Sequence, residues 1–382
     1  MGVIMGQSAV KVSVIIPSYK GSRRLLELVD AVISDPYPNK EVIVVIDKPD
    51  PKVLERLKGK SAKVIARNER KGKVSALRTA IENSTGELLL FLDDDVVPAY
   101  DNFIERVAEA MDGYDLGELR KIIVKNGLLS RMVYYDYISF NYGNHLFAKK
   151  LGRCIGFNGA AFVFWRKALE KVGGFKPVVA EDLEMGLDSY LAKLRFTYIK
   201  YPAVLNDPPR DLKDWFNQRM RWSVGAALWV KKNWRVLLRI IKENPLFTVL
   251  ILFFLLPTLA SMIFGLLAST ELMDKVLWLL FLSASSLHSG FLILAAFMSY
   301  KFLYTLFKAL IASIVSFGIF SVFFYKAAKT IDLKFNPLEF ALYYFVYSPL
   351  WLTVLFTGFV RVFIFKKETV KGWVIGGSPK GE

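Results

Sequence analysis

The sequence predicts an α/β domain with a mostly parallel sheet, followed by an α-helical transmembrane domain. Up to about Lys242, short β-branched runs alternate with segments of helical spacing, which is typical of α/β folds. Beyond it, long stretches carry almost no charge, and the whole chain is 53% hydrophobic with a mean hydropathy of +0.33. We expect a cytoplasmic α/β domain over residues 1–210, amphipathic interface helices over 211–243, about four membrane helices over 244–365 and a cytoplasmic tail over 366–382.

Four strands are predicted in the first part of the chain, over residues 12–16, 41–46, 63–66 and 88–92, with helices over 23–33 and 74–83. In open sheets of this kind, ligands bind outside the carboxyl ends of the strands. Polar residues follow three of the predicted strands, namely Pro17–Ser18, Asp47 and Asp93–Asp95. We therefore expect these residues to line one crevice.

Four apolar segments follow, over residues 244–270, 276–300, 302–325 and 340–360. Each is long enough to cross a hydrocarbon core, which takes roughly 20 residues. The third contains Lys308, and three lysines follow it before Pro337, so this segment could instead lie in the interface or re-enter. The N-terminus has no signal-peptide pattern. We expect an integral protein of the cell membrane, with the α/β domain and the C-terminus inside.

Basic residues outnumber acidic ones, with 51 Lys and Arg against 35 Asp and Glu and a net charge of +16. Many of them flank the apolar segments, which favours contact with membrane lipids over nucleic acid. The chain has one cysteine and two histidines. An intrachain disulfide is therefore impossible, and a zinc site of His and Cys ligands is not expected.

Three consecutive aspartates, Asp93–Asp95, end the apolar run "LLLFLDDDVVP". Carboxylates crowded this tightly repel one another, and a hard cation such as Mg²⁺ or Mn²⁺ would offset that repulsion. Such ions are typically held by one or two carboxylates together with substrate phosphates. A turn or helix cap is the alternative. We expect a metal and a phosphate group at this position.

Two further groups point to a phosphate and its nucleotide. Lys73 lies at the start of a predicted helix, where its ammonium and the backbone N–H groups could meet a phosphate. A solvated basic helix start is the alternative. Asp47 ends a predicted strand and could accept hydrogen bonds from a base or ribose, although an aspartate is also ordinary at a strand end.

Two motifs point to transfer chemistry. In "EDLEMG", Glu181 and Asp182 begin a predicted helix, where a carboxylate could take a proton from an attacking hydroxyl; acidic residues there also complement the helix dipole. In "QRMRW", Gln218–Trp222, the side chains could bind a sugar and steady a diphosphate. The alternative for "QRMRW" is anchoring at a membrane surface, which Arg and Trp also favour.

Taken together, these motifs resemble the membrane-embedded family 2 glycosyltransferases, a group that includes cellulose, chitin and hyaluronan synthases and ceramide glucosyltransferase. The resemblance covers about residues 11–225. It implies a GT-A fold, a nucleotide-diphosphate sugar donor (UDP or GDP), Mg²⁺ or Mn²⁺, and inversion at the anomeric carbon. The matching stretches are "VSVIIPSY" (12–19), Asp47, "GKVSAL" (72–77), Asp93–Asp95, "GFNGAAFVFWRKAL" (156–169), "EDLEMG" (181–186) and "QRMRW" (218–222).

The resemblance also implies roles for the donor site. Asp47 should contact the nucleotide base, Lys73 should lie near the nucleotide or its phosphates, and Asp95 should ligate the metal. Asp93 should contact the nucleotide. The remaining residues expected at the donor site are Pro17, Tyr19 and Asp94.

For the acceptor side, the resemblance implies that Asp182 is the general base, with Glu181 beside it. Gln218, Arg221 and Trp222 should hold the diphosphate and the acceptor end. The segment Phe157–Ala161 resembles the acceptor-proximal loop of the family.

Three functions remain open from the sequence. The first is transfer to a growing polysaccharide, as in a polysaccharide synthase; the second is a single transfer to a membrane lipid, either a glycolipid or a polyprenyl phosphate. "QRMRW" favours transfer to a polymer or to a ceramide-type lipid. Two features weaken the case for polymer secretion: the sequence lacks apolar helices before the region of the resemblance, and "KGWVIGG", with Trp373, resembles the gating loop of some synthases only loosely. The third is a transport or scaffold protein with an inactive domain, which should have lost the carboxylates that this chain keeps.

Overall fold

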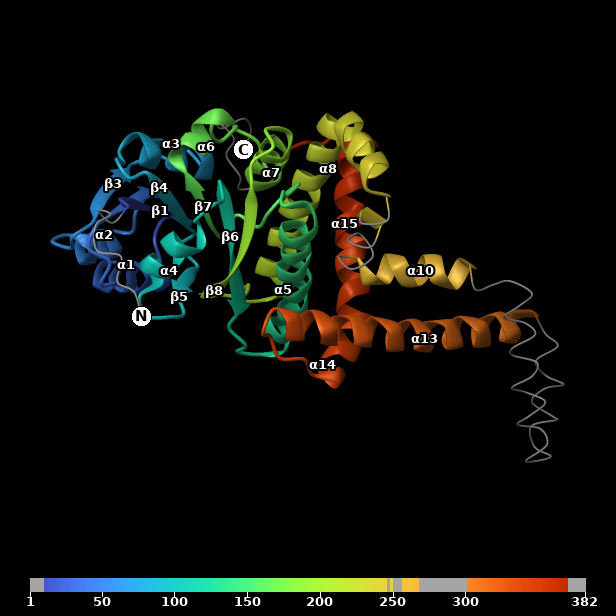
Figure 1. Ribbon diagram of the computed structural model, residues 1–382. Helices are drawn as coiled ribbons and strands as arrows, with labels where there is room; N and C mark the ends of the chain where they lie inside the picture. Colours follow the sequence, from blue (N-terminus) through green and yellow to red (C-terminus); the bar gives the residue numbers. More distant parts are fainter. Residues whose placement is uncertain (1–9, 246–247, 250–255, 268–300, 370–382) are drawn as a thin grey trace, which may run out of the picture. The chain divides into compact units, whose positions relative to one another are not determined.

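A computed structural model describes residues 10–245, 248–249, 256–267 and 301–369 (Figure 1). The chain divides into two compact units, Met1–Lys242 with Val354–Glu382, and Glu243–Thr353. The predicted apolar segment 276–300 and Trp373 lie outside the described residues, and segment 244–270 is described only in part.

The first unit is built on a sheet of eight strands in the order β3-β2-β1-β4-β7-β6-β8-β5. Figure 1 shows the strands running side by side through this unit. Their bounds are β1 (Val12–Tyr19), β2 (Lys40–Asp47), β3 (Lys63–Arg67), β4 (Leu88–Leu92), β5 (Val96–Pro98), β6 (Leu116–Ile123), β7 (Ala161–Trp165) and β8 (Phe196–Asn206).

The two halves of the sheet differ in direction. Strands β3, β2, β1 and β4 are all parallel, as expected, but β7 pairs antiparallel with both β4 and β6. Strand β8 then pairs parallel with β6 and antiparallel with β5. The sheet is therefore mixed, and the prediction of a mostly parallel sheet holds for its first four strands. Register places Tyr19 beside Asp47, and Asp47 beside Arg67, at one edge.

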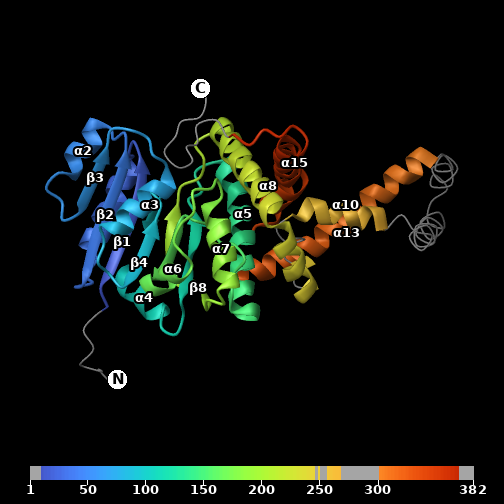
Figure 2. The ribbon, with the colours of Figure 1, turned by 90° about the horizontal axis from the view of Figure 1, so that it is seen from above.

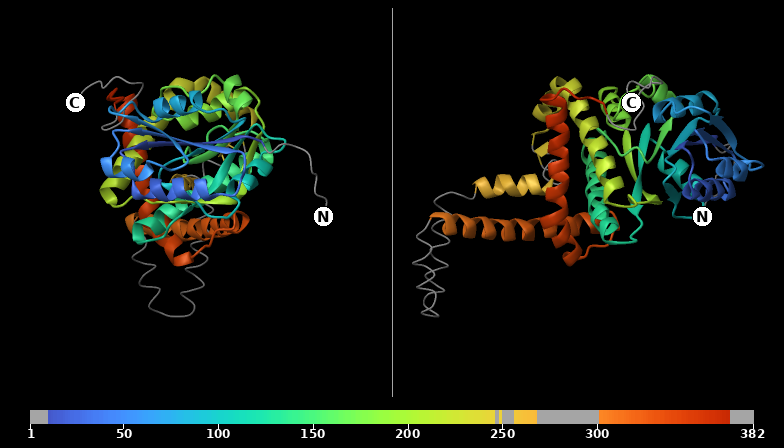
Figure 3. Two further views of the ribbon diagram at one scale, coloured as in Figure 1. Left: turned by 90° about the vertical axis from the view of Figure 1, so that its left-hand side faces the viewer. Right: turned by 180° about the vertical axis from the view of Figure 1, so that it is seen from behind.

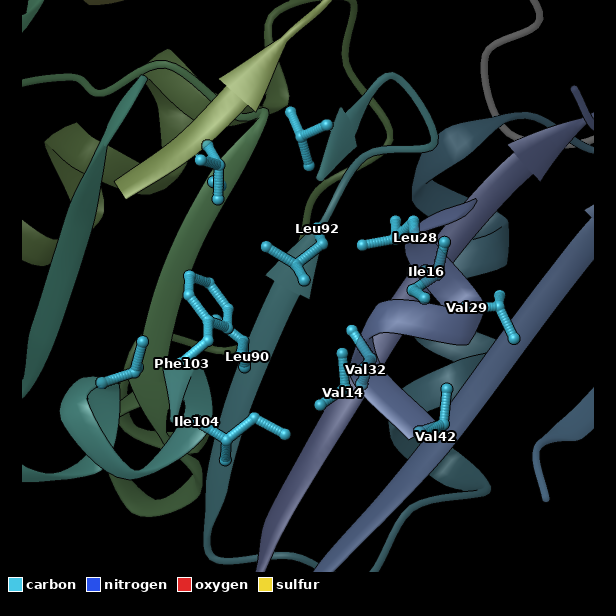
Figure 4. Packing of buried hydrophobic residues seen from close by; sticks show 14 of the residues in the cluster. Val14, Ile16, Leu28, Val29, Val32, Val42, Leu90, Leu92, Phe103 and Ile104 are labelled. Atoms are coloured by element: carbon cyan, nitrogen blue, oxygen red, sulfur yellow. The ribbon is translucent and has the colours of Figure 1, made fainter. Parts of the chain in front are cut away.

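Helices cover both faces of this sheet, as Figures 2 and 3 show. One face packs against α1 and α4 through a cluster that includes Val14, Ile16, Leu90 and Phe103 (Figure 4). The alternate residues of the same strands pack against α3, α6 and α7 on the other face, as the two-residue period of a strand requires. The helices of this part are α1 (Arg23–Ser34), α2 (Pro51–Leu57), α3 (Lys73–Glu82), α4 (Phe103–Ala110), α5 (Leu128–Leu146), the π-helical turn η1 (Phe147–Leu151), α6 (Arg166–Lys171) and α7 (Glu181–Leu191).

One continuous helix, α8 (Leu212–Glu243), occupies the region predicted as amphipathic interface helices. It buries Trp215, Arg219 and Val224 and exposes Trp234 and Leu238, so it has one packed and one open face. Helix α15 (Ser348–Phe363) approaches it closely at Gly358, where a Cβ atom would lie 2.3 Å from the Cβ of Ser223.

The second unit contains α10 (Pro257–Leu267), α13 (Lys301–Thr330), α14 (Pro337–Leu342), the π-helical turn η2 (Tyr343–Tyr347) and the start of α15. Helices α10 and α13 lie side by side (Figures 1 and 3). Two stretches of the described chain, Leu310–Thr330 and Pro337–Phe363, are long and apolar enough to cross a membrane. They overlap the third and fourth predicted segments, 302–325 and 340–360.

Candidate active site

The aspartate triplet forms the turn between β4 and β5, at the carboxyl end of β4. The backbone N–H of Asp93 donates to the carbonyl of Ala160 at 2.8 Å, and the N–H of Asp207 donates to the carbonyl of Asp95 at 2.9 Å. The amide Nδ2 of Asn206 also lies 3.3 Å from that carbonyl. The backbone of the turn is thereby fixed, and its carboxylates are held together.

The negative charges of the carboxylates in this turn are only partly compensated by neighbouring cations. Asp94 accepts a hydrogen bond from the hydroxyl of Ser18, yet burial and the charge of Asp93 raise its pKa to about 6. Burial, with the charges of Asp93 and Asp94, raises the pKa of Asp95 to about 7. The buried Oδ1 of Asp95 has no hydrogen-bond partner within the described residues. A cation at this position would relieve both the repulsion and the unpaired oxygen.

The donor set fits a hard divalent cation, which prefers carboxylate oxygens. No group of three or more His, Cys, Asp or Glu side chains within the described ranges is arranged to hold a metal by itself. A cation held by Asp95 would therefore take its other ligands from water or from substrate phosphates, the arrangement typical of Mg²⁺ sites.

Lys73, the first residue of α3, lies among these carboxylates. Its Nζ is 2.7 Å from Oδ2 of Asp93 and 3.4 Å from Oε1 of Glu181. Burial lowers the pKa of Lys73, but the two carboxylates outweigh that effect and raise it. Lys73 thus remains protonated and links the triplet to the start of α7.

The two acidic residues that begin α7 reach the same place. Asp182 accepts hydrogen bonds from the N–H of Gly159 (Oδ2, 3.2 Å) and from the N–H of Leu183 (Oδ1, 2.9 Å). Glu181 is buried, and burial raises its pKa although Lys73 lies beside it. Both carboxylates also lie at the positive end of a helix dipole, so this arrangement stabilises the helix as well as presenting Asp182.

The predicted acceptor loop, Phe157–Ala161, lies against these groups. A Cβ atom on Gly159 would be 3.2 Å from the Cβ of Asp182 and 3.4 Å from Nζ of Lys73. A Cβ atom on Gly186 of α7 would be 2.4 Å from the Cα of Gly156. Glycine at these positions allows the loop backbone to approach α7 and Lys73 this closely.

Asp47 is buried at the end of β2 and is already well satisfied. Its Oδ2 accepts hydrogen bonds from the backbone N–H groups of Lys71 and Gly72, both at 2.8 Å, and Arg67 lies 3.4 Å from its Oδ1. Asp47 therefore shapes the loop that leads into α3.

The other predicted donor-site residues lie on β1. Pro17 is buried within the strand, paired with Val45, whereas Tyr19 at its end is 41% exposed. The guanidinium of Arg70 lies 4.0 Å from the centroid of the Tyr19 ring. Tyr19 thus presents an aromatic face beside the loop that Asp47 shapes.

The "QRMRW" segment lies near the start of α8, with Gln218, Arg221 and Trp222 partly exposed. The positive charge of Arg221 lowers the pKa of Glu181, although burial dominates, so Arg221 lies near enough to the start of α7 to act on it. Arg219, which the sequence did not single out, is fully buried. Its Nη2 donates to Oδ2 of Asp136 on α5 at 2.7 Å, and its guanidinium lies 4.1 Å from the Trp222 ring.

The structure thus brings Lys73, the aspartate triplet, Glu181 and Asp182 together, and it places Asp47 with Tyr19 at the neighbouring strand ends. Sequence reasoning missed four residues around this cluster: Glu118, Lys121, Asn206 and Arg219. Each is buried and polar. A charged residue inside an apolar strand, as in "LGELRKII", was the available signal for the first two.

Comparison with known proteins matches part of the chain to a family model. Residues 13–173 match the family model described as glycosyl transferase family 2. The chain is 26% identical over 377 residues to a probable glycosyltransferase, YdaM, of Bacillus subtilis, covering 94% of this chain and 85% of that protein. It is 28% identical over 184 residues to probable glucomannan 4-beta-mannosyltransferase 3 of Oryza sativa, covering 44% of this chain but only 32% of the rice protein.

Among solved structures, the mannosyltransferase PcManGT from Pyrobaculum calidifontis, in complex with GDP-Man and Mn²⁺, aligns with a TM-score of 0.49 and 20% identity. The alignment covers 79% of this chain and 86% of that chain.

The predicted fold class, a Rossmann-like GT-A domain followed by a helical region, is confirmed. The chain is a glycosyltransferase, and its residues 13–173 are similar to the family 2 glycosyltransferases.

Proposed function

We propose that the chain is an inverting, metal-dependent membrane glycosyltransferase that moves a sugar from a nucleotide-diphosphate sugar to a growing polysaccharide. One observation carries the proposal: the half-buried, under-compensated carboxylates of Asp94 and Asp95 lie within one cluster with Lys73 and Asp182. A cation bound with a diphosphate would compensate the carboxylates of Asp94 and Asp95. An acceptor hydroxyl would approach Asp182.

On the donor side, Asp95 would hold Mg²⁺ or Mn²⁺, which, when bound, would neutralise charge on the diphosphate. Asp93 and Asp94 would lie beside the nucleotide, and Lys73 would keep Asp93 in place through the 2.7 Å contact. Asp47 would order the loop before α3, with Tyr19 beside it as a surface for the nucleotide base.

On the acceptor side, Asp182 would take the proton of the acceptor hydroxyl as its oxygen attacks the anomeric carbon. The bond between that carbon and the diphosphate oxygen breaks, and the nucleoside diphosphate leaves. A single displacement of this kind inverts the anomeric centre. Arg221, with Gln218 and Trp222, would face the diphosphate and the acceptor end, which agrees with the effect of Arg221 on Glu181.

The proposal places the active site on the cytoplasmic side of a membrane, and two observations support the membrane location. Two helices are long and apolar enough to span a bilayer, and no more than a third of either apolar window is buried. Exposed Trp234 and Leu238 on α8 lie among basic residues, a composition typical of helices in the membrane–water plane. Membrane lipids would thus be partners of α8.

A saccharide acceptor is supported by the names of the plant relatives, which describe glucomannan mannosyltransferases, and by the "QRMRW" segment at the start of α8. A GDP-mannose donor is therefore to be tested first, ahead of UDP-sugars. A single transfer to a membrane lipid, a glycolipid or a polyprenyl phosphate, is the alternative that the same experiment distinguishes.

The test uses the full chain purified in detergent with a lipid extract. GDP- and UDP-sugars are supplied in turn with Mn²⁺, Mg²⁺ or a chelator, and nucleotide release and product size are both followed. The proposal predicts metal-dependent release and a ladder of lengthening saccharides. A single organic-soluble product would replace the polymer with a lipid acceptor, and release unaffected by chelator would contradict the metal.

A further inference from the structure

The backbone of Asp95 is held from outside the aspartate triplet, at the end of β8. The N–H of Asp207 donates to the Asp95 carbonyl at 2.9 Å, and Nδ2 of Asn206 lies 3.3 Å from the same oxygen. The register between β5 and β8 pairs Asn206 with Val96, the residue after Asp95. The position of Asp95 therefore depends on where the chain places Asn206 and Asp207.

The side chain of Asp207 is fixed in turn by Arg24 of α1, 183 residues away in the chain. Nε of Arg24 donates to Oδ2 of Asp207 at 2.9 Å, and its Nη2 donates to Oδ1. A two-pronged contact of this kind fixes the orientation of the carboxylate as well as its distance. The remaining nitrogen, Nη1, donates to Oε2 of Glu27 at 2.9 Å. All three guanidinium nitrogens of Arg24 are thus engaged.

Helix α1 gives this contact a rigid base. Ser22 caps the helix, with its hydroxyl accepting from the N–H of Leu25 at 3.1 Å, and Leu25 is fully buried. The helix also lies against β5, the strand that follows the triplet. The preceding strand, β1, carries Ser18, whose hydroxyl donates to Asp94. The segment from β1 to α1 therefore reaches the triplet twice, once directly and once through Asp207.

Stability alone does not explain the contact between Arg24 and Asp207. Their side chains are 24% and 38% exposed, and ion pairs with this much solvent contact contribute little to folding. The contact is made, however, with the residue whose N–H holds Asp95, and Oδ1 of Asp95 is buried without a partner in the described part of the chain. Groups that hold the ligands of a metal in place typically change its affinity by about 10- to 100-fold.

We propose that Arg24 and Asp207 are positioning residues of the cation site. The pair holds the N–H of Asp207 against the Asp95 carbonyl and so fixes the direction of the Asp95 carboxylate. The inference rests on the proposed function in one respect, the role of Asp95 as the metal ligand.

The sign of the effect separates positioning from charge. Arg24 is a cation, so losing its charge alone would strengthen the binding of a nearby cation, whereas losing the charge of Asp207 alone would weaken it. Losing the anchor weakens cation binding in both cases. Two substitutions of opposite charge should therefore have the same effect.

The test compares Arg24→Gln, Arg24→Lys and Asp207→Ala in the full chain, purified in detergent. Asp207→Ala keeps the backbone N–H that reaches Asp95. Arg23→Gln is the matched control, because it removes the same charge from the neighbouring position, where Arg23 is 92% exposed and contacts the same Glu27. Two quantities are measured: hydrogen exchange over residues 93–97 and at the amide of residue 207, and Mn²⁺ affinity in the presence of GDP by electron paramagnetic resonance.

In Arg24→Gln and in Asp207→Ala we expect exchange at these amides to be about tenfold faster, because local opening becomes easier. We expect Mn²⁺ affinity to fall about tenfold in each. The double variant should be within about twofold of the single ones, since both remove the same contact. Arg24→Lys keeps the charge but loses the two-pronged contact, so its affinity should lie between those of wild type and Arg24→Gln. Arg23→Gln should stay within about twofold of wild type.

Unchanged exchange over 93–97 in the variants of Arg24 and Asp207 would overturn the inference whatever the Mn²⁺ affinity. So would tighter Mn²⁺ binding in Arg24→Gln with weaker binding in Asp207→Ala, because opposite signs would reduce the pair to its charges. If Arg24→Gln does not fold, Arg24→Lys and Asp207→Ala decide the matter by the same two measurements. Faster exchange in a protein whose wild type binds no Mn²⁺ with GDP would support the anchor and contradict the proposed function instead.

Discussion

At the end of β2 the Asp47 carboxylate is satisfied by the protein itself, whereas at the end of β4 the Asp95 carboxylate is not. Asp47 accepts two backbone hydrogen bonds of 2.8 Å and faces Arg67. Asp95 has a buried oxygen without a partner in the described part of the chain, and its pKa is raised to about 7. Both are strand-end aspartates of one parallel half-sheet, yet only one has its charge compensated.

This difference separates two tasks. A carboxylate that receives fixed N–H donors organises a loop, here the one leading into α3. A carboxylate left buried beside two others has a cost that a bound cation would remove. Lys73 compensates Asp93 and Glu181, which leaves Asp94 and Asp95 as the groups that a metal and a diphosphate would engage.

The largest expected effect comes from Asp182→Asn, which tests whether the start of α7 performs a third task, that of the base. The amide keeps the size and the hydrogen bond from Gly159 but cannot take a proton. We expect kcat to fall about 10²- to 10⁴-fold, the range for loss of a general base, with nucleotide affinity within about twofold. Turnover assays and calorimetry with nucleoside diphosphate measure both, and retained turnover would remove Asp182 from this role.

Asp136→Ala tests a charge that the protein compensates by itself. Arg219 is fully buried and donates to Asp136, so removal of the carboxylate takes away the hydrogen-bonded counterion of a buried cation. We expect a loss of about 3–5 kcal/mol in the free energy of unfolding. The control is Asp30→Ala, which removes the 59% exposed partner of Lys60 and should cost no more than about 1 kcal/mol. Equal losses in denaturant unfolding would contradict the account.

Gly159→Ala tests how tightly the loop must approach the two sides of the site. The added methyl would lie 3.2 Å from the Cβ of Asp182, so either the loop or α7 must shift by a few tenths of an ångström. We expect kcat to fall about tenfold, since small misplacements of reacting groups are costly. Gly143→Ala on α5, where a Cβ meets no atom within 4 Å, should leave kcat unchanged. A matching decrease in both variants would refute the loop argument.

Asp47→Asn should have the smallest effect. The amide oxygen still accepts a hydrogen bond, but the two N–H donors of Lys71 and Gly72 lose their charged partner. We expect nucleotide affinity to fall by less than about tenfold, with kcat at saturating donor unchanged. Complete loss of nucleotide binding in a folded variant would break the comparison, because it would mean that Asp47 binds the base directly rather than through its loop.

The parallel half of the fold could be predicted from the sequence because its signals are local. β1 to β4 and helices α1 and α3 lie within three residues of the predicted bounds, since apolar β-branched runs and helical spacing each span a single element. β6 could not be predicted in this way. Glu118, Arg120 and Lys121 are buried in it, and local patterns assign such residues to the surface.

The candidate site, too, could be predicted from the sequence only in part. The carboxylates could be located because strand ends of a parallel sheet meet at one edge, and Asp93–Asp95 and Asp47 do end their strands. Arg219 was missed because its partner, Asp136, is 83 residues away in the chain. Glu118 was missed because its partner, Lys121, is three residues away on the same strand, a spacing that ordinarily places two side chains on opposite faces of a sheet.

The most direct test of the central claim is Mn²⁺ binding, followed by electron paramagnetic resonance on wild type and Asp95→Asn with and without nucleoside diphosphate. The account predicts that wild type binds Mn²⁺ more tightly when the diphosphate is present, because the protein and the phosphates share the ion. It predicts that Asp95→Asn loses this enhancement while remaining folded. An Asp95→Asn variant that binds Mn²⁺ and diphosphate as wild type does would contradict the assignment of the aspartate triplet.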